Sequence, residues 1–189
     1  MSNRETALEL AQLIDRLDRL VRSGETLQGL NPAQWEALRY LARANRFSRT
    51  PAALADYLGS TRGTVSQTLI VLEQKGHVAR LRSSRDKRSI DLGLTESGRA
   101  MLTHDPLHQL AADLAATRSV DLAAVVTLLR EVLFRAIARN GGRAFGVCRS
   151  CRHFRQLPPS ADSYGRCTLL DEPLSEADAA AICSEQVAV

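Results

Sequence analysis

Two short helix-forming segments in this chain are separated only by the turn Leu58-Gly59-Ser60-Thr61. The first begins at Thr50-Pro51, a hydrogen-bonding cap followed by a residue that suits the first helical position. The second spans residues 62–74 and ends at Lys75-Gly76. A tight, glycine-containing turn between two such helices is typical of a helix-turn-helix. This spacing constrains the fold more than any other feature of the sequence.

The segments on either side extend this motif into a larger unit. Asn31-Pro32 starts an earlier helix that fades near Asn45 and carries Trp35, Leu38 and Leu41 on one face. Residues 77–81 and 89–94 alternate between apolar and polar, and a charged stretch joins them, which predicts a β-hairpin with a long tip. Residues 31–95 are therefore expected to run helix, short helix, helix, hairpin.

The start of the second motif helix is rich in side chains that bind nucleic acid. In a helix-turn-helix this end enters the major groove, where hydroxyl, guanidinium and amide groups contact phosphates and base edges. The alternative is an ordinary solvated helix face. The candidate DNA-binding residues here are Thr61, Arg62, Thr64, Ser66 and Gln67.

The predicted hairpin tip concentrates positive charge. A projecting basic tip can follow phosphates or place an arginine in a narrow minor groove. The net charge of +4 and the pI of about 9.2 permit a polyanionic partner such as double-stranded DNA. The alternative is a loop that serves only solubility. The candidate residues are Arg82, Arg85, Lys87 and Arg88.

Apolar stripes near both ends of this region predict a homodimer. Residues 6–21, ended by Ser23-Gly24, and residues 120–139, capped by Ser119, carry more apolar surface than one small domain needs. Two copies can bury these stripes in a shared bundle, although packing within one subunit is the alternative. A two-fold dimer predicts an inverted-repeat operator with half-sites about one helical turn apart.

The order of these segments resembles the MarR family of winged-helix transcriptional regulators. The resemblance covers about residues 5–139 and implies a dimeric DNA-binding protein, usually a repressor, and not an enzyme. It also implies that Asp86 braces the wing while Arg88 or Arg85 reaches DNA. Gly63 departs from the pattern, because many relatives carry proline there. The matching segments are residues 30–35, 50–55, 61–66, 72–78, 86–89 and 94–98.

All four cysteines lie in the last 42 residues, as Cys148-x2-Cys151-x15-Cys167-x15-Cys183. Four thiolates can close a tetrahedral zinc site or hold one iron–sulfur cluster. Disulfides and unrelated thiols are the alternatives, but nothing at the N-terminus indicates a signal peptide and no segment reaches transmembrane length. We therefore expect a cytoplasmic protein, away from any membrane, with a metal site in its tail.

The tail also resembles small modules with the motif Cys-x-x-Cys-x-x-Phe, then Gly-x-Cys, then Cys, which hold a [4Fe–4S] cluster or, in other cases, zinc. Zinc ligands usually come as two close pairs, and only one pair is close here, so an iron–sulfur cluster ranks slightly above zinc. His153 is an alternative ligand, but it is expected to be a neighbour of the site or a surface residue.

The predicted fold class is mainly α with a small β-hairpin wing (α+β). The expected parts are an N-terminal dimerisation helix (1–30), the winged helix-turn-helix (31–100), C-terminal dimerisation helices (101–140) and a loop-rich cysteine extension (141–189) whose last short helix, opened by Ser175, carries Cys183. The expected function is a DNA-binding repressor modulated by the cluster through the helix that ends at Arg139. The alternatives are a structural zinc site with a small-molecule effector, or a redox carrier or enzyme.

Overall fold

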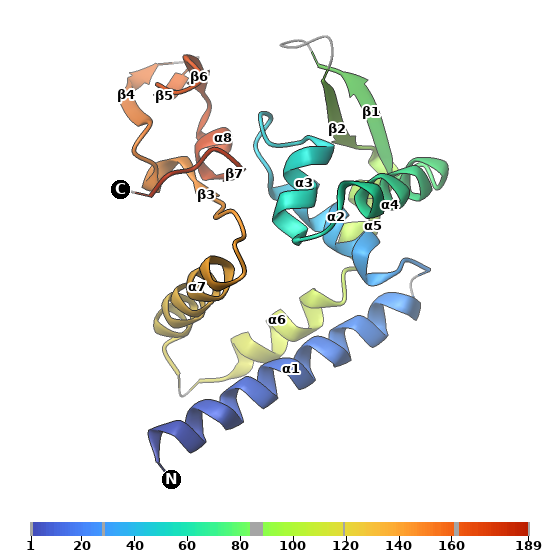
Figure 1. Cartoon of the computed structure of the whole chain (residues 1–189), viewed down its shortest axis with the longest axis vertical. Coiled ribbons are helices and arrows are strands. Elements are labelled where there is room, and N and C mark those ends of the chain that lie inside the picture. The colour runs from blue at the N-terminus through green and yellow to red at the C-terminus, as the bar shows by residue number, and fades with distance from the viewer. Residues whose placement is uncertain (1, 28, 84–88, 119, 161–162, 189) are drawn as a thin grey trace.

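The chain is arranged as a winged helix, a layer of long helices and a small C-terminal unit (Figure 1). The computed structural model describes residues 2–27, 29–83, 89–118, 120–160 and 163–188. Its elements are α1 (Asn3–Leu27), α2 (Pro32–Arg43), α3 (Pro51–Leu58), α4 (Arg62–Gln74), β1 (Val78–Arg82), β2 (Ile90–Leu94), α5 (Glu96–Thr103), α6 (Leu107–Ala116), α7 (Leu122–Arg139), β3 (Gly146–Val147), the 3-10 turn η1 (Cys148–Ser150), β4 (Phe154–Ser160), β5 (Ser163–Cys167), β6 (Glu172–Leu174), α8 (Glu176–Ala180) and β7 (Ile182–Cys183).

The winged helix forms as the sequence predicts, and the fold class is confirmed as mainly helical with small antiparallel sheets. Thr50 caps α3 by accepting a hydrogen bond from the Ala53 amide at 3.1 Å. Gly59 ends that helix with φ of 59°, a left-handed conformation in which glycine avoids the strain of a Cβ. Strands β1 and β2 pair antiparallel, with Val78 opposite Leu94. Local capping signals therefore place the turn of the helix-turn-helix.

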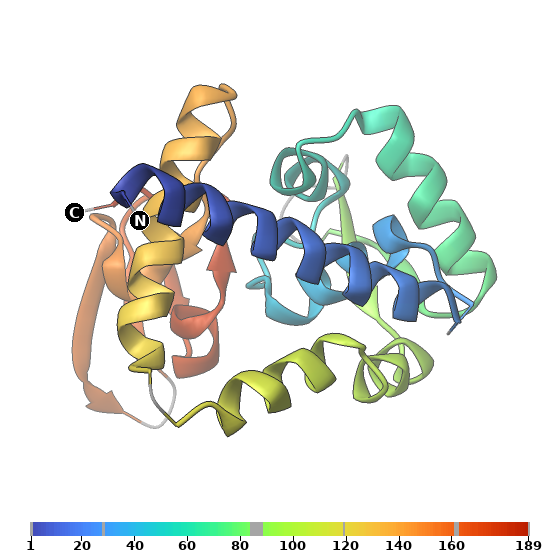
Figure 2. The same ribbon diagram turned by 90° about the horizontal axis from the view of Figure 1, so that it is seen from below.

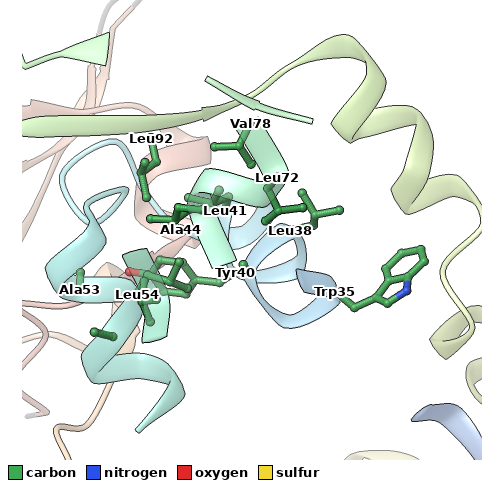
Figure 3. Packing of buried hydrophobic residues seen from close by; sticks show 14 of the residues in the cluster. Trp35, Leu38, Tyr40, Leu41, Ala44, Ala53, Leu54, Leu72, Val78 and Leu92 are labelled. Atoms are coloured by element: carbon green, nitrogen blue, oxygen red, sulfur yellow. The ribbon is translucent and has the colours of Figure 1, made fainter. Parts of the chain in front are cut away.

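Helix α2 lies at the centre of the main core. The side chains of Trp35, Leu38 and Leu41 are at most 1% exposed, and full burial of such a side chain contributes about 1.5–3 kcal/mol. Figure 3 shows Leu41 and Ala44 close to Leu92 of the wing strand, while Trp35 points away at the other end of the helix. The core thus joins α2 to α4, to the wing and to the region near α1.

The long helices differ in their ends from the prediction. Gly24 does not end α1, which continues to Leu27. A Cβ at Gly24 would lie only 3.3 Å from Cβ of Pro106, so the glycine allows a close approach of the chain before α6. Asp121, rather than Ser119, caps α7, because its carboxylate accepts from the Ala123 amide at 2.9 Å. Ser119 lies outside the described residues.

The apolar faces of these long helices are open in a single chain. Helices α6 and α7 contain no buried residue, and Figure 2 shows α1 passing in front of α7, while α6 does not cross it in that view. Among the described helices, none is long and apolar enough to span a bilayer. The exposed apolar side chains on α1 and α7 are Leu8, Leu10, Leu13, Ile14, Leu17, Leu20, Leu122, Val126, Leu128, Leu129, Val132, Leu133 and Phe134.

The C-terminal tail contains more regular secondary structure than the loop-rich segment that the sequence predicts. Strands β3 and β7 pair antiparallel, and β4, β5 and β6 form a second, three-stranded sheet. Ser175 caps α8 as predicted, accepting from the Asp178 amide at 3.0 Å. However, the prediction that this helix carries Cys183 is wrong: the chain turns extended at Ala181, and Cys183 lies in β7 opposite Gly146.

A buried ionic cluster ties α1 and the start of α6 to α2. The guanidinium of Arg39 donates to Glu25 at 2.6 Å and to both carboxylate oxygens of Asp105, at 2.5 and 2.7 Å. Burial by itself would raise the pKa of Asp105, but the hydrogen bonds from Arg39 and the Leu107 amide outweigh it and lower this pKa below its ordinary value. Arg39 also lies over the ring of Trp35.

Replacement of Arg39 by methionine is expected to lower the free energy of unfolding by about 3–5 kcal/mol, because two buried carboxylates lose their partner. The pKa of Asp105 is lower in the folded state than its ordinary value of 3.8. The stabilisation that the ionised Asp105 gives to the folded protein is therefore fully present above pH 3.8, and it is lost as the pH falls through the pKa of the folded state. Urea unfolding at fixed protein concentration measures both effects. The control is Arg19→Met, which breaks an exposed pair with Asp15 and should change stability by about 1 kcal/mol or less. Equal losses in the two variants would contradict a buried cluster.

Candidate DNA-binding surface and cysteine cluster

Threonine hydroxyl groups cap the start of α4. Thr61 caps the helix by accepting from the Thr64 amide at 3.1 Å, and the two hydroxyls lie 2.9 Å apart. Both residues are exposed. The cap supplies a helix end whose amides and hydroxyls face solvent, which is the arrangement that contacts phosphates. Thr61 therefore has a structural role in addition to its predicted binding role.

The remaining candidates on α4 differ in how available they are. The side chain of Arg62 is 70% exposed and lies 3.9 Å from the Asp56 carboxylate, a weak pair that leaves it able to reach outward. Gln67 is exposed. Ser66 is half-buried, and its carbonyl oxygen accepts from Arg80 of β1 at 3.5 Å. Arg62 and Gln67 are thus the α4 side chains best presented for contact.

The wing projects beside α4 (Figure 1). Arg82 is exposed at the end of β1, opposite Ile90. The predicted tip residues Arg85, Asp86, Lys87 and Arg88 lie outside the described residues.

Arg80 is a structural neighbour of this surface that the sequence did not single out. Its guanidinium lies 3.3 Å from the Glu73 carboxylate of α4 and also contacts the Ser66 carbonyl. It thereby ties the wing to the recognition helix. The alternation of β1 predicts a strand at this position, but it gives no signal for such a cross-element contact.

The four cysteines come together from separate elements and line one small cavity of about 10 Å³, with His153, Phe154, Leu174 and Glu185. Cys148 begins η1, Cys151 follows it, Cys167 ends β5, and Cys183 lies in β7. All four are free cysteines in this structure. Cys167 is half-buried and the other three are buried. The predicted convergence of the cysteines is therefore present.

Charge is shared unequally between two of the thiols. A hydrogen bond from Cys148, together with those from Asn45, the Glu185 backbone and Ser48, outweighs burial and lowers the pKa of Cys183 to about 6. The same bond to Cys183, together with burial, raises the pKa of Cys148. Of these two sulfurs, Cys183 is thus the more ready to act as a thiolate, which is the form that binds metals.

The donor set fits a thiolate-bound metal, although the described residues contain no group of three His, Cys, Asp or Glu side chains arranged to hold an ion. A zinc ion needs sulfur atoms at about 2.3 Å from the metal. A cluster takes each thiolate on a different iron. The residue types therefore suit a thiolate-bound metal, and they favour neither zinc nor a cluster.

The tail is seated on the loop between α2 and α3 (residues 44–50, the α2–α3 loop). The Asn45 amide donates to the Ile182 carbonyl at 2.8 Å, and the Ser184 amide donates to the Ser48 hydroxyl at 2.8 Å. Arg46 reaches the tail with bonds to Asp178 at 2.9 Å and to the Pro173 carbonyl at 2.6 Å. No local pattern predicts these contacts, since their partners lie more than 120 residues apart.

The helix-turn-helix, the paired wing and the open terminal helices define a winged-helix protein of the DNA-binding class. Residues 28–89 match the model of the MarR family. Over 125 residues the chain is 29% identical to the transcriptional repressor MprA of Escherichia coli K12, covering 63% of this chain and 69% of that protein. The matched region is thus similar to transcriptional regulators.

Solved structures show the same fold. The transcriptional regulator BldR from Sulfolobus solfataricus has a TM-score of 0.55 at 23% identity, covering 71% of this chain and 99% of that one. The MepR F27L mutant of S. aureus, bound to an oligodeoxyribonucleotide, has a TM-score of 0.50 at 17% identity, covering 70% and 96%. These structures show that the chain shares their winged-helix fold.

Replacement of Thr61 by alanine is expected to lower the free energy of unfolding by about 0.5–2 kcal/mol, because α4 loses its cap. The matched variant Gln67→Ala, on the same helix but without a capping bond, should change it by about 0.5 kcal/mol or less. Urea unfolding of both variants measures the difference. A Thr61 variant as stable as the parent protein would show that the cap adds nothing.

Proposed function

We propose that this chain forms a homodimer that binds an inverted-repeat site in double-stranded DNA, acts as a repressor, and carries a thiolate-bound metal centre in its tail. The observation that carries the DNA-binding part is the exposed start of α4 beside the wing, where Arg62, Gln67 and Arg82 face solvent. The similarity to the repressor MprA and to a MepR structure with bound oligodeoxyribonucleotide supports the same reading.

The open apolar faces support the homodimer. Leu20 of α1 is 62% exposed and Leu133 of α7 is 56% exposed, and both lie on helices with apolar stripes. Monomeric proteins seldom leave such long apolar stripes in water. A two-fold pairing of these helices buries them and presents two α4 helices to successive major grooves.

The cysteine cluster supports the metal centre. Cys148, Cys151, Cys167 and Cys183 would hold it, because all four line one cavity. Our first choice is an iron–sulfur cluster of the [4Fe–4S] type, which the motif resembles, and zinc is the alternative. When bound, a cluster supplies redox sensitivity, whereas zinc supplies only a structural tie. In the zinc alternative, a small-molecule effector would regulate the protein. The CouR structure, which has the same fold, contains bound p-coumaroyl-CoA.

DNA binding is tested with a duplex obtained by selection from random sequences on the full-length protein. Replacement of Gln67 by alanine should weaken binding to this duplex by about 1–3 kcal/mol and relax its sequence preference. Replacement of Arg82 by alanine should weaken all duplexes alike and reduce the slope of log affinity against log salt by about 0.9. Fluorescence anisotropy with salt titration measures both.

The control for this experiment is Arg135→Ala, an exposed residue of α7 outside the winged helix. It should leave affinity and salt slope unchanged. Sedimentation of the complex should give two chains for each duplex. Recovery of no selected sequence, or equal effects in all three variants, would rule out the proposed surface.

The metal centre is tested by anaerobic purification of the full-length protein. If a cluster is bound, the protein should be brown, with about four irons in each chain. If zinc is bound, the protein should be colourless, with about one zinc in each chain. Replacing Cys151 by serine should lower the metal content severalfold, while the control His153→Ala should keep it. Protein without either metal, both as purified and after reconstitution, would contradict the proposed centre.

A further inference from the structure

The linker between α7 and β3 (residues 140–145) leaves the last turn of α7 in a fixed direction. The Gly142 amide donates to the Ile137 carbonyl at 3.0 Å, and the Gly141 amide donates to the Ala138 carbonyl at 3.3 Å. Gly141 has a φ of 63°, a left-handed conformation that glycine adopts without strain. A Cβ at Gly142 would lie only 3.2 Å from Cγ2 of Ile137. The end of α7 is therefore a tight turn, and it sets the path of the linker.

One side chain of this linker, Phe145, is seated between α2 and α3. Its ring meets Tyr57 of α3 edge to face, with centroids 5.2 Å apart and planes at 86°. It meets Tyr40 of α2 in the same way, at 6.2 Å and 85°. This edge-to-face arrangement is one that aromatic pairs prefer. Phe145 is half-buried and packs against the main core, so it ties the linker to two helices of the winged helix.

The residues that receive Phe145 are themselves fixed in the winged helix. Tyr40 is 1% exposed, and its hydroxyl donates to the Ser48 carbonyl at 2.6 Å. The rings of Tyr40 and Tyr57 lie 4.7 Å apart. Helices α3 and α4 share the main core through Leu54 and Val65. A contact with Tyr57 therefore acts on α3 and, through this packing, on α4.

The chain stays on the winged helix after Phe145. Arg143 pairs with Glu185 of the tail at 2.7 Å, and Val147 of β3 lies opposite Ile182 of β7. The Ile182 side chain packs into the main core, and its carbonyl accepts from the Asn45 amide at 2.8 Å. The linker is thus a strap that runs from the end of α7 to the core of the winged helix (Figure 1).

Helix α7 depends on such attachments for its orientation. None of its residues is buried in a single chain, so its own side chains pack only loosely. It is joined to the winged helix through α6 at its start and through the strap at its end. Two attachment points fix the angle between two bodies, whereas one leaves a hinge.

We propose that Phe145 is a positioning residue that fixes the angle between α7 and the helix-turn-helix. In the dimer of the proposed function, this angle sets the distance between the two α4 helices and so selects the spacing of the DNA half-sites. The effect on DNA rests on the proposed function, but the attachment of the linker by Phe145 does not.

The attachment is tested by amide hydrogen exchange on the full-length protein. Phe145→Ala is expected to speed exchange by about tenfold in residues 140–147 and 51–58, because both segments lose the contact that holds them. The matched control Leu169→Ala, which shortens an apolar side chain that is 48% exposed in the tail, should change neither segment. Unchanged exchange in Phe145→Ala, or equal increases in the two variants, would overturn the proposal.

A milder variant covers the case in which Phe145→Ala does not fold. Phe145→Leu keeps an apolar side chain and loses the ring edges. It should speed exchange in the same two segments by a smaller factor, about threefold. An increase spread over the whole chain would contradict a local attachment.

The positioning role has its own measurement, on the selected duplex and on versions with base pairs inserted between its half-sites. Each inserted pair moves one half-site by about 3.4 Å. The parent protein should prefer the selected spacing over a two-pair insertion by about tenfold, and Phe145→Ala should reduce this preference to about threefold or less. Affinity for a duplex with one half-site should stay within about twofold of the parent value, because α4 and the wing keep their side chains. An unchanged spacing preference, or a loss confined to half-site affinity, would refute the positioning role.

A double variant identifies the partner of Phe145. Tyr57→Ala removes the α3 side of the contact and should weaken the spacing preference as Phe145→Ala does. The double variant should add no more than about twofold to either single change, because both remove one interaction. Fully additive effects would overturn the assignment of Tyr57 as the partner. A parent protein that binds no duplex would contradict the proposed function alone, because the exchange experiment tests the attachment without DNA.

Discussion

Burial of helix α2 is the constraint on which the other elements depend. Its apolar side chains, from Trp35 to Leu41, are almost without solvent contact, and they pack against α4, β2 and the chain near α5. The helix is kept in place at its middle by Arg39, whose bonds to Glu25 and Asp105 reach α1 and the start of α6. At its end, the α2–α3 loop receives the tail. One buried helix therefore connects the three parts of the molecule.

The energetic character of these three connections differs. The wing and α4 are joined to α2 by apolar contact, which is strong but tolerant of small shifts. The Arg39 cluster is ionic and buried, so it holds one geometry and is costly to break. The junction with the tail relies on directed hydrogen bonds around Asn45 and Ser48.

This arrangement gives the cysteine tail a short physical path to the surface proposed to bind DNA. The four thiols meet at one cavity, and Cys183 at its edge lies against a loop that caps α3 and contacts β2. The terminal helices, by contrast, present open apolar faces suited to a second copy of the chain. The surface proposed for dimer formation and the surface that contacts the tail are thus different.

Local signals predicted much of this fold. Thr50, Gly59 and Thr61 cap or end their helices through bonds to residues at most four positions away, so their effect is visible in the sequence. The alternation of apolar and polar residues in the wing strands is likewise a local signal that is visible in the sequence. The end of α1 was predicted less well. Gly24 lies inside this helix, where Pro106 packs close to it. The tail strands were missed, since each has only two to seven residues and pairs across irregular turns.

The sequence by itself determined the helix-turn-helix, the wing and the four cysteines as a set, because capping, periodicity and spacing are local properties. Only the tertiary structure decided that these cysteines line one cavity and that Cys183 lies against Asn45 and Ser48. It also decided that Arg39 meets Asp105, 66 residues further along. Contacts of this kind follow from how the chain is packed, and single polar residues so far apart leave no periodic pattern that could announce them.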